Sequence, residues 1–203
     1  MSHPFLGFWS GWRFLPLWIV ATCLGFAIGG PVSALIPDYV TAIAGNNAAN
    51  ILSFGVMSLT IALPQWLVLR GRIRDALWWL VVTTLGGMAG GPISMTIAWN
   101  LSITFGDAVD LFAIYAALRG ATTGLAQWTF LRVQMPQAGW WAIATSVSWY
   151  SSLTIGSKVM FTLPSFTVAI VGASYGVMTG IVMFLLLRQK AFAQSKTNSA
   201  NPK

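Results

Sequence analysis

Apolar residues gather into six long runs that are separated by short polar breaks. The runs lie near 14–36, 49–69, 77–101, 110–131, 139–162 and 166–188. Each has about 20 or more residues, which is the length a helix needs to cross roughly 30 Å of hydrocarbon. Short connections make consecutive helices antiparallel neighbours. The pattern predicts an all-α integral membrane protein with six transmembrane helices.

Composition supports lipid as the main solvent. The chain is 56% hydrophobic and 7% charged, whereas a soluble domain carries roughly 25% charged residues. We expect a cytoplasmic N-terminal segment at 1–13, a six-helix bundle at 14–188 and a disordered basic tail at 189–203, which is polar.

Charged residues predict the topology. Seven basic residues lie before helix one or in the breaks after helices two, four and six: Arg13, Arg70, Arg72, Arg74, Arg132, Arg188 and Lys190. Lys158 is the one cation near the opposite breaks. The opposite breaks hold Asp38, Asp107 and Asp110. The positive-inside rule then places both termini in the cytoplasm, in a bacterial inner (plasma) membrane. Because these basic residues lie in the breaks between apolar runs, we do not expect nucleic acid as a partner.

The chain resembles itself at intervals of about 60 residues. Trp18 and Trp79 are each followed, at the same offsets, by G-x-x-x-G-G-P-x-S, and Trp141 opens a third copy. Gln-Trp-x-x-Leu-Arg ends the second helix of the first two copies, at Gln65 and Gln127. The third copy keeps Arg188 and lacks Gln-Trp. The sequence predicts three tandem parallel helical hairpins, at about 14–70, 77–132 and 139–188.

Small residues recur four apart, a spacing that lets helix backbones approach closely in lipid. The candidates for helix packing are Gly25, Gly29, Gly30, Gly86, Gly90, Gly91, Gly120, Gly124, Gly176 and Gly180. They could join helices within the chain or bind a partner helix, and their presence in each repeat favours internal packing. The Gly-Gly-Pro steps also predict a kink or local opening, and with it a cavity.

Tryptophans cluster near the ends of the runs that carry the basic residues. Indole rings prefer the headgroup level of a bilayer, which predicts interface anchors at Trp66, Trp78, Trp79, Trp128, Trp140 and Trp141. The alternative is that the doublets 78–79 and 140–141 line a pocket or contact a pigment. Their position at helix starts favours anchors.

Arg119 is the most informative single residue, because it stands thirteen residues before Arg132 and therefore deep in the expected bilayer. Tyr115, Thr123 and Gln127 share its helical face. The resulting polar stripe is a candidate ligand site for an anion or polar headgroup. Equally, Arg119 could snorkel to the outer interface or pair with Asp107.

Lys158 is the second candidate ligand-binding cation, on the fifth run. It could meet Asp107 or Asp110 at the outer mouth, or simply lie exposed at the interface. No enzymatic constellation accompanies these residues. One histidine, one cysteine and no glutamate leave no triad or metal cluster and predict no catalytic residue, metal or cofactor.

The repeated Gln-Trp-x-x-Leu-Arg, followed by Trp-Trp at the next helix, resembles uncharacterised Trp-rich multipass membrane proteins of bacteria, including cyanobacteria. The resemblance covers residues 14–188 and implies no activity or binding residue. In length and helix number alone, the chain is also similar to the substrate-binding subunits of energy-coupling-factor vitamin transporters.

These observations predict a non-enzymatic polytopic membrane protein. It would pack with a membrane partner or a second copy of itself, or accommodate a hydrophobic, lipid-like molecule. The alternative is a small-molecule transporter, or a transporter's substrate-binding subunit, with a cavity near Arg119.

Overall fold

The computed structural model describes residues 4–108, 110–163 and 166–200, with 4–12, 107 and 193–200 described by their backbone alone. These ranges form five α-helices and a short 3₁₀ turn, without a strand: α1 (Pro4–Leu69), α2 (Leu77–Phe105), η1 (Gly106–Ala108), α3 (Leu111–Leu131), α4 (Gly139–Val159) and α5 (Thr167–Ala200). The prediction of an all-α protein is confirmed.

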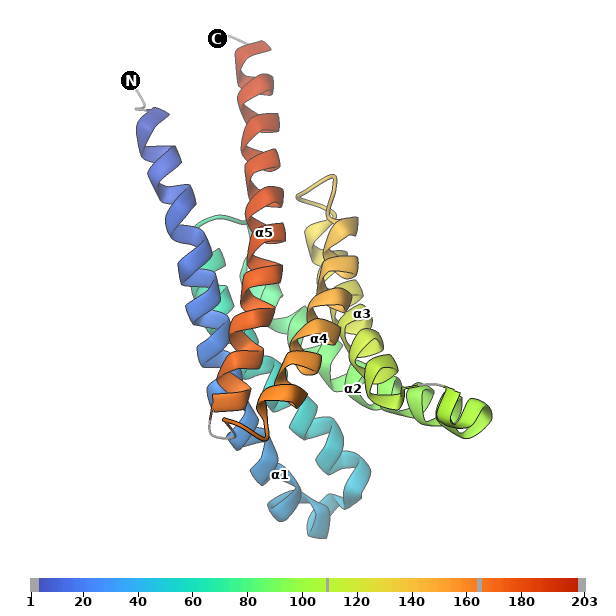
Figure 1. Cartoon of the computed structure of the whole chain (residues 1–203). Coiled ribbons are helices and arrows are strands. Elements are labelled where there is room, and N and C mark those ends of the chain that lie inside the picture. Colours follow the sequence, from blue (N-terminus) through green and yellow to red (C-terminus); the bar gives the residue numbers. More distant parts are fainter. Residues whose placement is uncertain (1–3, 109, 164–165, 201–203) are drawn as a thin grey trace.

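Helix α1 has two arms that meet at Gly45, where φ is 79° and ψ is 168°. Glycine adopts this backbone without steric cost, so the chain reverses there, as the blue-to-cyan ribbon shows (Figure 1). The Gly-Gly-Pro steps behave otherwise. Helix runs through both Pro31 and Pro92, so the backbone stays helical at these two steps.

Three helical stretches are long and apolar enough to cross a membrane: Arg13–Leu69, Leu77–Phe105 and Thr167–Phe192. The expectation of six such spans is therefore only partly met. The runs at 14–36 and 49–69 lie on the two arms of α1, within the one stretch Arg13–Leu69. Helices α3 and α4 fall short because they carry many polar residues. Helix α5 continues to Ala200.

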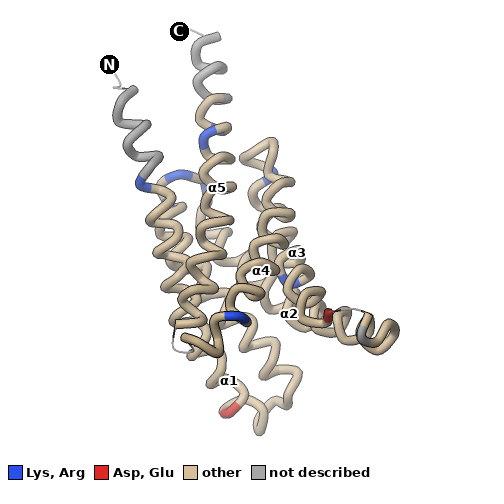
Figure 2. The backbone as a smooth tube through the Cα atoms, in the orientation of Figure 1, with Lys and Arg blue, Asp and Glu red and all other residues tan. Residues whose placement is uncertain are grey.

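The helices form a closed ring. Each helix packs against the next along the chain, and α5 packs back against α1. Both termini lie at one end of the bundle, together with the turns that follow α1 and α3 (Figure 1). Most of the basic residues gather at this end as well (Figure 2).

The main hydrophobic core lies at this same end of the ring. It includes Phe14, Trp18, Trp79, Trp141 and Met183. Ile73 and Met135 anchor the two turns in it and are buried. At the other end of α2, Asp110 begins α3 as its N-cap, accepting hydrogen bonds from the amides of Phe112 and Ala113.

Candidate functional site

Three tryptophans meet in the centre of the bundle. The ring centroids of Trp18 and Trp79 are 6.0 Å apart, those of Trp18 and Trp141 6.3 Å, and those of Trp79 and Trp141 5.6 Å. All three pairs are edge-to-face, the geometry that aromatic quadrupoles favour. We call Trp18, Trp79 and Trp141 the tryptophan triad.

The triad corrects the expectation for two of the interface anchors. Trp79 and Trp141 are 0% and 1% exposed, whereas their neighbours Trp78 and Trp140 are 57% and 63% exposed. Successive residues on a helix point about 100° apart, so only one member of each doublet can face the lipid. In each doublet the second member turns inward.

The other two expected anchors lie beside arginines at the helix ends. Trp66 and Trp128 are partly buried against the core. The guanidinium of Arg70 lies 5.9 Å from the Trp66 ring, and that of Arg132 lies 4.9 Å from the Trp128 ring. Both distances allow a cation–π attraction.

Two of the triad tryptophans are each held by a glutamine. Trp79 Nε1 donates to Gln65 Oε1 at 3.2 Å, and Gln65 Nε2 donates to Thr22 Oγ1 at 3.0 Å. Sixty-two residues later, Trp141 Nε1 donates to Gln127 Oε1 at 2.8 Å. Gln127 Nε2 then donates to Thr83 Oγ1 at 3.0 Å. We call these two chains of hydrogen bonds the glutamine relays.

The third tryptophan uses a shorter connection. Trp18 Nε1 donates directly to Thr179 Oγ1 at 3.1 Å. Counting back from Arg188 as from Arg70 and Arg132, the position of Gln65 and Gln127 is occupied by Met183, which is fully buried. All three indole N–H groups are thus satisfied inside the bundle, as burial in lipid requires.

Arg119 lies in the layer of side chains next to the tryptophan triad and is 1% exposed. Its Nη1 donates to the Gly87 carbonyl at 2.6 Å and its Nη2 to Ser58 Oγ at 3.1 Å. The guanidinium also lies 4.9 Å from the Phe54 ring and 5.6 Å from the Trp149 ring. Arg119 therefore points into the bundle and does not snorkel.

Gly87 makes room for this arginine. Eight residues after each triad tryptophan stand Phe26, Gly87 and Trp149. Phe26 and Trp149 pack on each other and on Tyr175 with ring centroids 5.5–5.6 Å apart. At Gly87 the ring is missing, and an added Cβ would lie 1.8 Å from Ser58 Oγ. Arg119 occupies the side of the layer where the third aromatic ring is absent.

Several buried hydroxyls have no hydrogen-bond partner among the described residues, including Thr123 Oγ1, Ser94 Oγ and Ser152 Oγ. Thr123 lies one helical turn from Arg119 on α3. A cavity of about 10 Å³ is lined by Thr123, Ser58, Tyr175 and both relay glutamines, among others. One water needs roughly 10–15 Å³ of such space. The cavity therefore fits a single water at most.

The remaining candidates for ligand binding are divided. Thr123 and Gln127 are buried near Arg119, and Tyr115 is partly exposed. The phenols of Tyr115 and Tyr175, rather than a carboxylate, lie within electrostatic range of Arg119 among the described side chains. Lys158 is exposed at the end of α4. The side chain of Asp107, its suggested partner, lies outside the described residues.

The candidate packing glycines lie where two helices touch. A Cβ at Gly25 would come within 2.6 Å of Ile61 Cα, between the arms of α1. One at Gly120 would come within 2.5 Å of Ser146 Cα on α4, and one at Gly176 within 3.1 Å of Ile19 Cα on α1. The neighbours are segments of this chain, so these glycines serve the ring itself.

A groove runs along the outside of the bundle between α4 and α5, with a volume of about 370 Å³. Its walls are almost entirely apolar, and two glutamines stand at the end near the termini: Trp140, Ile143, Ala144, Val147, Val182, Leu185, Leu186, Gln137 and Gln189. An elongated apolar cleft with a few polar groups at one end is a typical site for a hydrophobic ligand.

Arg72 belongs to the turn after α1 rather than to a site. It donates to the Val68 carbonyl and lies 5.4 Å from the Phe14 ring. Burial lowers the pKa of the Arg72 guanidinium from its usual value. The side chain covers the end of the core next to the triad.

No family model, curated protein or solved structure matches the chain. What it does must therefore be argued from its own contacts.

Sequence reasoning missed the triad and the relays, although the repeat contained a signal for both. The first apolar run, at 14–36, has a single tryptophan, Trp18, which aligns with Trp79 and Trp141 rather than with Trp78 and Trp140. The position shared by all three copies is the inward one. The spacing of 14 residues between Gln65 and Trp79 also recurs between Gln127 and Trp141.

Proposed function

We propose that this chain is a non-enzymatic, six-span membrane protein of three parallel hairpins, which holds a lipid-like molecule in the groove between α4 and α5. The observation that carries the proposal is this groove, whose walls are apolar and whose end bears Gln137 and Gln189. The amides would hydrogen-bond a polar headgroup, and the walls would hold a hydrocarbon chain.

Helices α3 and α4 fit a membrane span better than their mean hydropathy suggests. Several of their polar side chains face inward, since Arg119, Gln127, Thr145 and Ser148 are all buried. Their outward faces carry large apolar residues: Phe112, Leu125, Ile143, Val147 and Ile155. Lipid would meet the apolar face only, which is the arrangement expected for polar residues within a membrane.

The distribution of charge supports the proposed topology. The termini and the arginine-bearing turns share one end of the bundle (Figures 1 and 2). By the positive-inside rule that end faces the cytoplasm, in a bacterial inner membrane. Reporter fusions at residue 45 and at the C-terminus test this, and an external C-terminus would contradict it.

The groove is tested by filling it. Ala144 is a small residue on its wall, and Ala144→Phe should reduce the lipid retained after gentle extraction, as measured by native mass spectrometry. Leu125→Phe, on the exposed face of α3, is the matched control and should retain lipid normally. Equal retention by both variants and the natural protein would overturn the proposal.

Transport through a cavity at Arg119 has less support. Two of the donors of that arginine are used within the chain, and the adjacent cavity fits one water at most. We expect Arg119→Met to lower thermal stability while lipid retention by the folded protein stays normal. Loss of uptake or ligand binding with unchanged stability would favour the transport alternative.

Packing with a membrane partner is a second candidate function. The half of α2 beyond Gly91 extends away from the ring (Figure 1) and exposes Ile93, Ile97, Trp99, Ile103 and Phe105. Exposed apolar patches of this kind mark interaction sites when lipid alone does not cover them. Crosslinking from position 99 in native membranes tests this, and a protein that crosslinks only to lipid would count against it.

A further inference from the structure

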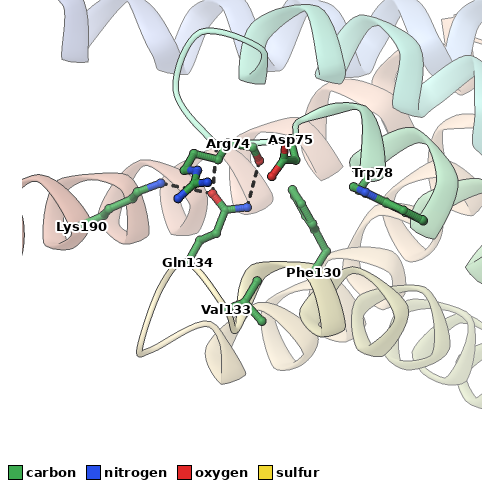
Figure 3. Close-up of a pocket in the computed structure, with 7 residues that line it drawn as sticks. All are labelled: Arg74, Asp75, Trp78, Phe130, Val133, Gln134 and Lys190. Atoms are coloured by element: carbon green, nitrogen blue, oxygen red, sulfur yellow. Dashed lines mark hydrogen bonds between the residues drawn. The ribbon is translucent and has the colours of Figure 1, made fainter.

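A second pocket lies at the end of the bundle where the termini meet, with a volume of about 470 Å³. Arg74 and Asp75 from the turn after α1, Gln134 from the turn after α3 and Lys190 from α5 line it (Figure 3). Trp78 and Phe130 complete its wall. Segments more than 100 residues apart in sequence thus bring two cations into one pocket.

Gln134 holds the pocket together. Its Oε1 accepts from the Arg74 amide at 3.0 Å and from Lys190 Nζ at 3.3 Å, and its Nε2 donates to the Arg74 carbonyl at 3.0 Å. These bonds use the backbone of Arg74 and leave its guanidinium without a hydrogen bond or ion pair among the described residues. Figure 3 shows Arg74 and Lys190 converging on the Gln134 amide.

The charges favour an anion. Lys190 lies close enough to Arg74 to be affected by its positive charge. Asp75 is the only carboxylate among the described residues that line the pocket, and the charges of these side chains therefore sum to one net positive. Two like charges held together are stabilised by an anion between them, and guanidinium and ammonium groups are the usual ligands of phosphate.

The rest of the wall favours an anion that carries hydrocarbon. Trp78 and Val133 are largely exposed at the pocket, and Phe130 lies beside Gln134 (Figure 3). Tryptophan prefers the level of lipid headgroups. A phosphate with attached glycerol and acyl chains would place its charge at Arg74 and Lys190 and its apolar part against these rings.

We propose that this pocket binds the phosphate of an anionic phospholipid of the cytoplasmic leaflet. The inference rests on the proposed topology, which puts this end of the bundle at the inner surface. It is independent of the groove between α4 and α5, because the two pockets share no lining residue.

The test uses the full-length protein in a neutral detergent, titrated with short-chain phosphatidylglycerol and, separately, with short-chain phosphatidylcholine. Binding is read from lipid adducts in native mass spectra and from the shift in melting temperature. We expect phosphatidylglycerol to bind more tightly. Lys190→Gln and Arg74→Gln should each weaken it about fivefold, since one basic residue near an anionic lipid contributes about 1 kcal/mol.

Arg132→Gln is the matched control, because Arg132 lies at the same end, is exposed and stacks on Trp128 outside the pocket. It should bind phosphatidylglycerol like the natural protein. An equal loss in all three variants would overturn the inference in favour of a general surface charge effect. Equal stabilisation by inorganic phosphate alone would overturn it in favour of a free anion.

Two further results separate this site from the proposed function. Ala144→Phe should leave phosphatidylglycerol binding unchanged, even where it abolishes lipid retention in the groove. If the reporter fusions place the C-terminus outside while Lys190→Gln still weakens binding, the topology fails and the pocket itself stands. Undiminished binding in Lys190→Gln and Arg74→Gln overturns the pocket, whatever the topology.

Discussion

Two of the triad tryptophans, Trp79 and Trp141, are held by different side chains from the third, Trp18. For Trp79 and Trp141, a glutamine bridges a buried indole to a threonine on another helical segment. For Trp18, Met183 stands where the glutamine would be, and Thr179 accepts from Trp18 directly. No glutamine bridges Trp18 to a threonine, but the Trp18 N–H still has a hydrogen-bond acceptor.

The comparison separates what the ring requires from what varies between its parts. All three copies bury a tryptophan at the same position, because the three rings fill the centre together. The acceptor can change, since an indole needs only one oxygen. The layer of side chains around Arg119 varies more. Phe26 and Trp149 fill two of its sides, and the Arg119 side chain fills the third, beside Gly87.

The largest expected effect comes from removing a ring of the triad. Trp141→Ala should lower the free energy of unfolding by about 3–5 kcal/mol, because it leaves a large void and removes the donor to Gln127. Trp140→Ala, its exposed neighbour, should change it by about 0.5 kcal/mol or less. Denaturation in detergent measures both. Equal losses would return Trp141 to the role of an interface anchor.

A smaller loss of stability distinguishes the glutamine relays from the direct hydrogen bond between Trp18 and Thr179. Gln127→Leu should cost about 1–3 kcal/mol, because it leaves the Trp141 N–H buried without an acceptor. Met183→Leu, at the equivalent position on α5, removes no hydrogen bond and should cost less than about 1.5 kcal/mol. If both variants melt at the same temperature, the glutamine contributes packing alone.

The smallest effect tests whether the two solutions are interchangeable. Thr179→Val should cost about 1–2 kcal/mol, because it leaves the buried Trp18 N–H without an acceptor. The cost is smaller than for Gln127→Leu, which breaks two hydrogen bonds. Adding Met183→Gln should recover most of that loss, since a glutamine there would accept from Trp18 as Gln65 accepts from Trp79. A double-mutant cycle gives the coupling. Simple additivity of the two changes would mean that Trp18 cannot use a glutamine relay.

Some features of the molecule could be predicted from single residues and their spacing. The all-α architecture followed from apolar runs of span length. The inward direction of Arg119, Thr123 and Gln127 followed from their four-residue spacing, because residues at this spacing lie on the same face of a helix and point the same way. Their burial in the structure has that cause.

Other features depend on contacts between distant segments. The partners of Arg119 are Gly87 and Ser58, which lie 32 and 61 residues away, and no local pattern joins them. The pocket at Arg74 requires Gln134 and Lys190 from two other segments. The position of the reversal within α1 also escaped prediction, because the helix runs through Pro37 and the chain turns at Gly45.

Helix α5 closes the ring against α1 and so brings Trp18 to the other two tryptophans. Cys23, the only cysteine in the chain, tests it, because its Sγ lies 3.4 Å from the Ala169 carbonyl on α5. Mild oxidation of Ala169→Cys in native membranes should give an intramolecular disulfide, seen as faster migration of the monomer. Val177→Cys, exposed on the same helix, should give none. Equal crosslinking of the two variants, or none in either, would contradict the closed ring.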